Sequence, residues 1–120
     1  MRPDERDAGY LLDMLEHARG VLRVLRGRTL EDYVRDEDLR LIVERRIEII
    51  GEAARRVSEA FQKTHPEIPW LKIVAQRNVL AHEYGEIQDD ILWQVATVSV
   101  PELITLLEPL VPAPPSEPEC

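Results

Sequence analysis

Residues 36–61 read DEDLRLIVERRIEIIGEAARRVSEAF, and this stretch decides the fold class. Its apolar side chains recur at steps of three and four, which is the spacing of one face of an α-helix. Acidic residues open the stretch, where a helix N-terminus favours negative charge. The stretch therefore predicts one long helix from residue 36 to about residue 61 or 63. Its apolar positions are Leu39, Ile42, Val43, Ile47, Ile50, Ala53, Ala54, Val57 and Phe61.

Helical spacing continues on both sides of this stretch, and no segment is predicted as a strand. Even the β-branched run at residues 47–50 is embedded in helical periodicity. The chain is therefore predicted to be all-α, an up-down bundle of four to five helices. The other predicted helices cover residues 7–26, 30–35, 70–82 and 88 or 89 to 108. Pro101 falls inside the last of these and should kink or restart it.

Local signals predict where these helices end. Gly27 is placed to end the first helix, and Thr29 with Asp32 three residues later approximates a capping box for the second. The segment HPEIP at residues 65–69 is the clearest loop. Gly51 lies within the long helix, where glycine costs about 1 kcal/mol relative to alanine. Close approach of a neighbouring helix would explain why glycine is tolerated there.

The length of 120 residues fits a single domain. We expect residues 1–108 to form one helical domain and residues 109–120, which are rich in proline, to be a disordered tail. No run of about 18 apolar residues predicts a membrane-spanning helix, and the charged N-terminus does not resemble a signal peptide. The lone Cys120 suits a reducing compartment. A cytoplasmic protein without membrane association is the expectation.

The net charge of −8 argues against a protein that coats nucleic acid non-specifically. Residues 1–60 nevertheless hold 12 arginines, so an RNA contact would need a local patch. Arg45, Arg46 and Arg56 on the long helix are the candidate RNA-binding residues. The plainer alternative is a solvated helix face with intrahelical pairs, such as Glu52 with Arg56.

Residues 77–84, RNVLAHEY, concentrate unusual polar residues where a helix is predicted to end. A histidine such as His82, with a pKa near 6.5, can accept the 2′-hydroxyl proton of RNA or protonate the leaving oxygen. The guanidinium of Arg77 can hold the phosphate. These groups permit RNA cleavage by internal transesterification. The plainer alternatives are a dipole-compensating His82, an ion-paired Arg77 and a half-buried packing Tyr84.

No metal-site spacing is found in the sequence, because the three histidines lie on different segments and the only cysteine is terminal. His17 and His65 are interpreted as surface residues. Trp70 and Trp93 are interpreted as anchors of the core or of an interface.

Three segments together resemble the HepT-like proteins of the HEPN superfamily. They are residues 46–54 (RIEIIGEAA), the Pro69-Trp70 step and residues 77–84. The family's R-x4-H-x-Y motif falls on Arg77, His82 and Tyr84, and Asn78 matches the polar residue that follows the arginine. The resemblance covers about residues 7–108 and implies a bundle of the HEPN type.

The resemblance also implies an activity and partners. The chain would be the toxin of a type II/VII-like toxin–antitoxin pair, a metal-independent endoribonuclease with Arg77, Asn78 and His82 as catalytic residues. It would be a homodimer with two motifs facing one cleft. Its antitoxin, a minimal nucleotidyltransferase, would silence it by AMPylation of Tyr84; ATP and Mg²⁺ would serve the partner, and this chain would need no cofactor. A non-catalytic HEPN scaffold beside a nucleotidyltransferase is the alternative.

Overall fold

The computed structural model describes residues 4–82 and 89–111, and all regular structure within these residues is helical. The prediction of an all-α chain is therefore confirmed. The elements are α1 (Glu5–Leu25), α2 (Leu30–Arg35), α3 (Glu37–Arg56), α4 (Glu59–Thr64), α5 (Trp70–His82), α6 (Asp89–Gln94), the π-helical turn η1 (Val95–Ser99) and α7 (Val100–Leu107).

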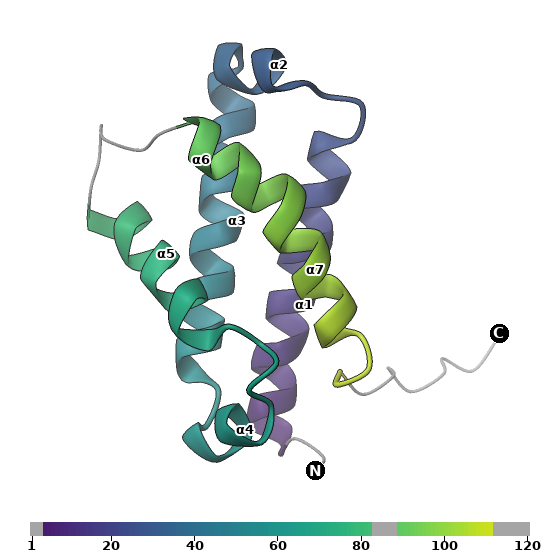
Figure 1. Cartoon of the computed structure of the whole chain (residues 1–120), viewed down its shortest axis with the longest axis vertical. Coiled ribbons are helices and arrows are strands. Elements are labelled where there is room, and N and C mark those ends of the chain that lie inside the picture. The colour runs from purple at the N-terminus through teal and green to yellow at the C-terminus, as the bar shows by residue number, and fades with distance from the viewer. Residues whose placement is uncertain (1–3, 83–88, 112–120) are drawn as a thin grey trace, which may run out of the picture.

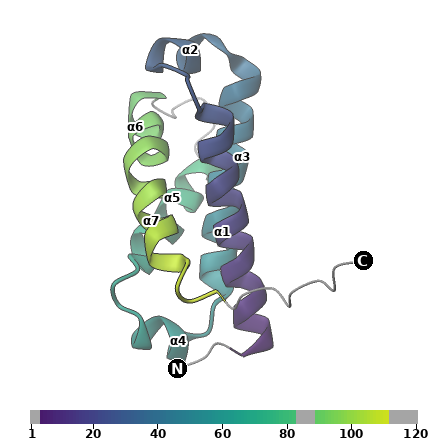
Figure 2. The same cartoon turned by 90° about the vertical axis from the view of Figure 1, so that its right-hand side faces the viewer.

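The helices form two layers. Figure 1 shows α3 between α1 and α5, with the run from α6 to α7 crossing in front of them. The side view in Figure 2 shows this run as a separate layer. The molecule measures 41 × 39 × 19 Å, and its short dimension fits two helix layers packed about 10 Å apart.

The local signals at the first two helices are confirmed. Gly27 adopts a positive φ of 75° directly after the end of α1, a conformation that glycine adopts without steric cost. The backbone N–H of Thr29 donates to the Asp32 carboxylate at 2.9 Å, and the N–H of Asp32 donates to the Thr29 hydroxyl at 3.1 Å. This reciprocal pair is the capping box that the sequence predicted.

The prediction of one helix running to residue 61 or 63 is wrong. The helix α3 ends at Arg56, and α4 begins only at Glu59. The buried carboxylate of Asp7 accepts hydrogen bonds from the Ser58 N–H at 2.8 Å and the Ser58 hydroxyl at 2.6 Å. The same hydroxyl accepts from the N–H of Phe61 at 3.2 Å and so caps α4. A contact with α1 therefore interrupts a continuous helical pattern.

The predicted restart at Pro101 is not seen, because the backbone stays αR at Gln94, Ser99 and Val100 and a π-helical turn precedes the proline. The π-helical turn at Val95–Ser99 ends with the N–H of Val100 bonded to the carbonyl of Val95. Pro101 then lies in the first turn of α7, where the missing N–H of proline is tolerated.

By length and composition alone, Asp89–Leu107 could cross a membrane, although the sequence predicted no such helix. A third of its most apolar window is buried in the bundle. The buried residues of the run are Leu92, Ala96, Val100, Leu103, Ile104 and Leu107.

The aromatic anchors are confirmed, but the interpretation of His65 as a surface residue is wrong. Trp70 is buried, and its indole N–H donates to the carbonyl of His65 at 2.9 Å. Trp93 packs against the buried ring of Tyr33, with ring centroids 5.7 Å apart. The side chain of His65 is only 14% exposed and stacks on Phe61, so it is not a surface residue.

Gly51 is required because α5 approaches α3 closely at this point. A Cβ built on Gly51 would lie 2.1 Å from the Cβ of Arg77 and 3.1 Å from the carbonyl oxygen of Ile73. The expectation that a neighbouring helix explains this glycine is therefore confirmed.

Gly51→Ala is expected to lower the free energy of unfolding by about 1–2 kcal/mol. Overpacking costs about 1–3 kcal/mol, and a contact of 2.1 Å with the Cβ of Arg77 places the cost in the upper half of this range. It therefore outweighs the roughly 1 kcal/mol that alanine gains in a helix. Urea unfolding followed by circular dichroism measures the change. The matched control is Gly9→Ala, because a Cβ on Gly9 meets nothing within 4 Å. This control should raise the stability by about 0.5–1 kcal/mol, and equal shifts in the two variants would contradict the close approach.

Candidate active site

Arg77 is held against α3 by the close approach at Gly51. Its side chain is 25% exposed, and its Nη2 lies 3.2 Å from Oε2 of Glu52, the residue that follows Gly51. Glycine and glutamate at consecutive positions of α3 thus have separate effects. Gly51 allows the backbones of α3 and α5 to approach each other. Glu52 then binds the guanidinium of Arg77, which this approach brings within reach.

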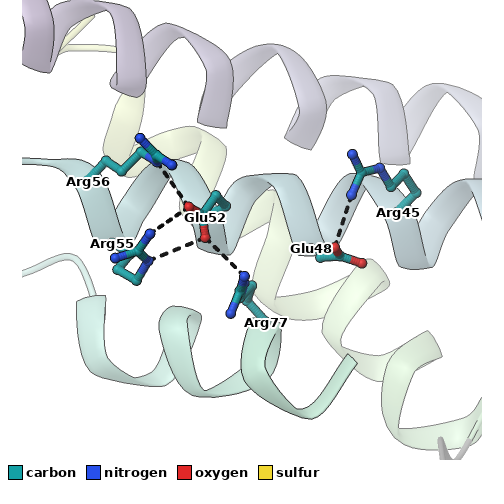
Figure 3. A network of polar contacts seen from close by, with 6 residues as sticks. All are labelled: Arg45, Glu48, Glu52, Arg55, Arg56 and Arg77. Carbon is teal, nitrogen blue, oxygen red and sulfur yellow. Dashed lines mark hydrogen bonds and ion pairs between the residues drawn. The ribbon is translucent and has the colours of Figure 1, made fainter. Parts of the chain in front are cut away.

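Glu52 binds three arginines at once (Figure 3). Nη2 of Arg55 lies 2.7 Å from its carboxylate, and Nε of Arg56 lies 2.9 Å from it. Hydrogen bonds from Arg55 and Arg56 lower the pKa of Glu52 to about 2. The carboxylate is therefore ionised at neutral pH and orients all three guanidinium groups.

Around Glu52, three guanidinium groups share one carboxylate, whereas the whole chain carries a net charge of −8. A cleft of about 420 Å³ opens beside this group, and its lining includes Tyr10 of α1 and Arg77 of α5. The charged side chains of the lining are balanced, with three arginines and three acids: Arg45, Arg56, Arg77, Asp13, Glu48 and Glu52. Guanidinium groups facing an open cleft can bind a phosphate by paired, charge-assisted hydrogen bonds.

The other predicted residues of the 77–84 motif are described only in part. The backbone of α5 is helical as far as His82. The side chains of Asn78 and His82, and all of Tyr84, lie outside the described residues. Their roles in catalysis and modification therefore stay predictions.

The three candidate RNA-binding arginines do not lie together. Arg45 and Arg56 line the same cleft as Arg77. Arg56 forms the intrahelical ion pair with Glu52 that the sequence predicted, and Arg45 pairs with Glu48. Arg46 points instead toward α1 and lines a different cleft.

Sequence reasoning identified Arg77 but missed that Glu52 is its partner. Glu52 was assigned only to a pair with Arg56, four residues later on the same helix. The signal that could have found the contact is the glycine directly before Glu52, since a glycine inside a helix marks a point where another backbone approaches. In residues 4–82 and 89–111, no group of three His, Cys, Asp or Glu side chains is arranged to hold a metal ion.

Comparison with known proteins finds a family model and several relatives that match this chain. Residues 14–110 match the family model described as ribonuclease HepT-like. A candidate RNase of Methanocaldococcus jannaschii is 33% identical over 94 residues, which cover 78% of this chain and 86% of the relative. A candidate ribonuclease HepT of Thermococcus cleftensis is also 33% identical over 94 residues, with the same two coverages. No solved structure matches the chain significantly.

Proposed function

The chain belongs to the ribonuclease HepT-like family, and on this premise we propose that it is an endoribonuclease toxin of a toxin–antitoxin pair. The observation that carries the proposal is the guanidinium of Arg77, which Glu52 holds beside an open cleft. An arginine in this position can bind the scissile phosphate and stabilise the extra negative charge of the transition state. The relatives' names give the substrate class, RNA.

The proposed reaction is internal transesterification. The 2′-hydroxyl of one nucleotide attacks the adjacent phosphorus, the bond to the 5′-oxygen of the next nucleotide breaks, and a 2′,3′-cyclic phosphate forms. His82 accepts the 2′-hydroxyl proton or donates a proton to the leaving 5′-oxygen. Asn78 assists by hydrogen bonding, and the reaction requires no metal ion or other cofactor in this chain.

The proposed assembly is a homodimer in the cytoplasm. One Arg–His pair offers few groups for a phosphodiester, and a symmetric interface would bring a second pair to the same cleft. Exposed apolar side chains on α3, such as Leu41 at 55% and Ile42 at 43%, supply surface that a second copy could cover. The proposed antitoxin is a minimal nucleotidyltransferase that uses ATP and Mg²⁺ to attach AMP to Tyr84.

One experiment on the purified chain tests the activity and the assembly together. Labelled single-stranded RNA should be cleaved in the presence of EDTA to products ending in 2′,3′-cyclic phosphate, and light scattering at micromolar concentration should give twice the mass of 13.8 kDa. Activity that EDTA abolishes would refute the metal-independent reaction. A dimer that cleaves no RNA would favour the alternative of a non-catalytic scaffold, and a monomeric mass would refute the dimer.

A further inference from the structure

Arg46 does not line the cleft beside Arg77 and has a separate environment between α3 and α1. We call this position, against Gly20 and His17, the seat of Arg46. Its side chain is half-buried and crosses from α3 to α1, where it covers Gly20. A Cβ on Gly20 would lie 2.5 Å from both the central carbon and Nη1 of the guanidinium. The absence of a side chain at Gly20 therefore lets the guanidinium lie directly against the backbone of α1.

The partner of Arg46 in this seat is an imidazole. Its Nη1 lies 3.1 Å from Nδ1 of His17, and because a guanidinium can only donate, Nδ1 must be the acceptor. Burial and the charge of Arg46 lower the pKa of His17, which favours this neutral form. The interpretation of His17 as a surface residue is therefore wrong, since its side chain is half-buried and supports Arg46.

Among the described residues, no carboxylate lies within ion-pair distance of Arg46, so none of them compensates its positive charge. Arg45 and Arg77, in contrast, each have such a carboxylate. A cleft of about 330 Å³ opens beside its guanidinium, and Arg19 and Arg23 line the same cleft. Glu16 also lines this cleft, and Arg19 pairs with Glu108 at 3.4 Å. The three arginines still outnumber these two acids.

This cleft adjoins the one beside Arg77. Arg45 lines one cleft and its neighbour Arg46 lines the other, and on α1 the corresponding neighbours are Asp13 and Glu16, about one turn apart. Along α3, Arg46 precedes Glu52 by six residues, which is about 9 Å along the helix axis and about 120° around it. An RNA strand that continues from Arg77 around α3 toward α1 could present a flanking phosphate to Arg46.

We propose that Arg46, seated on Gly20 and flanked by Arg19 and Arg23, is a second phosphate subsite for the RNA strand that is cleaved at Arg77. This proposal rests on the proposed function, and it adds a contact that positions the strand without taking part in the reaction. An uncompensated guanidinium with a fixed orientation binds a phosphodiester without first breaking an ion pair. Contacts of this kind set the register of a nucleic acid and do not depend on its sequence.

The test measures binding of a 2′-O-methylated single-stranded RNA oligonucleotide, which lacks the attacking hydroxyl and cannot be cleaved. Fluorescence anisotropy compares wild type with Arg46→Gln and with Gly20→Ala, which keeps the charge but pushes the guanidinium from its seat. Both variants should bind about tenfold more weakly. For Arg46→Gln, the slope of log affinity against log salt should fall in magnitude by about 0.7. The matched control is Arg6→Gln on exposed Arg6 of α1, which should bind like wild type.

Wild-type affinity in either Arg46→Gln or Gly20→Ala would overturn the subsite, as would failure of the wild-type protein to bind the oligonucleotide. Thermal melts by circular dichroism confirm that the variants are folded. Cleavage of unmodified RNA is measured separately on the same proteins. If the wild-type protein binds RNA through Arg46 but cleaves no RNA, the proposed nuclease activity is refuted and the proposed subsite is retained. If Arg46→Gln cleaves RNA with an unchanged KM, the proposed subsite is refuted and the proposed nuclease activity is retained.

Discussion

Replacing His82 with alanine is expected to slow RNA cleavage by about a hundredfold or more, the usual contribution of a positioned general acid or base. The fold should be retained, because His82 is the last residue of α5 and alanine has a high helix propensity. Single-turnover cleavage of labelled RNA in EDTA measures the rate, and a thermal melt measures the fold. The expectation fails if His82→Ala cleaves at the wild-type rate.

Arg77→Ala should cause a loss of similar size, because the guanidinium would no longer stabilise the developing charge on the phosphate. The structure gives a reason why this variant should still fold. Glu52 retains its contacts with Arg55 and Arg56 when Arg77 is removed, so no carboxylate is left without a partner. A matched control is Arg35→Ala, since Arg35 is 77% exposed on α2 and pairs with Glu31.

The losses in the two single variants should not add. If Arg77 and His82 act on the same phosphodiester, the double variant should be about as slow as the slower single variant. Fully multiplied losses would show that the two side chains act in separate steps or at separate sites. A rate for Arg35→Ala as low as that for Arg77→Ala would show that general loss of positive charge, and not the site, explains the effect.

The second large effect is expected at Tyr84, where replacement by phenylalanine should abolish AMPylation completely. Co-expression with a cognate nucleotidyltransferase, or incubation with it and ATP and Mg²⁺, should add one or more adenylyl groups to the wild-type chain. Intact-mass spectrometry should detect these additions and peptide mapping should locate them on Tyr84. An adenylyl phosphate two residues from His82 would compete with substrate for the guanidinium of Arg77. Cleavage by the modified wild-type protein should therefore fall to background.

The other tyrosines provide the controls for this prediction. Tyr33 is fully buried, so its hydroxyl is not accessible to another enzyme. Tyr10 is half-buried in the second turn of α1 and lines the cleft beside Arg77. If Tyr84 is the target, Tyr10→Phe should be modified like wild type. An unmodified wild-type mass together with full neutralisation would mean that the partner inhibits by binding alone.

The sequence by itself determined the helices whose signals are local. The capping box at Thr29 and Asp32 and the glycine at position 27 each act within about four residues, and the structure has both as predicted. Helical periodicity likewise placed α5 at Trp70–His82 and excluded strands from the described residues. The resemblance to the HepT-like family could also be recognised from the sequence, because it rests on residue types at fixed spacings.

Only the tertiary structure decided features that depend on contacts between distant parts of the chain. Asp7 and Ser58 are 51 residues apart, and their hydrogen bonds divide a stretch that is continuous in periodicity. Helical spacing reports which side chains share a face, but it does not report which polar group from another helix competes for the backbone at one point. For this reason the end of α3 could not be predicted.

The same reasoning applies to the candidate site. Gly51 suggested a close neighbour, but only the packing of α5 on α3 showed that this neighbour is Arg77. Arg45 and Arg46 are adjacent in sequence and were grouped together, yet a rotation of about 100° per residue around the helix sends Arg46 to His17 on α1. Which cation meets which partner is fixed by the relative positions of three helices, and a single sequence does not contain that information.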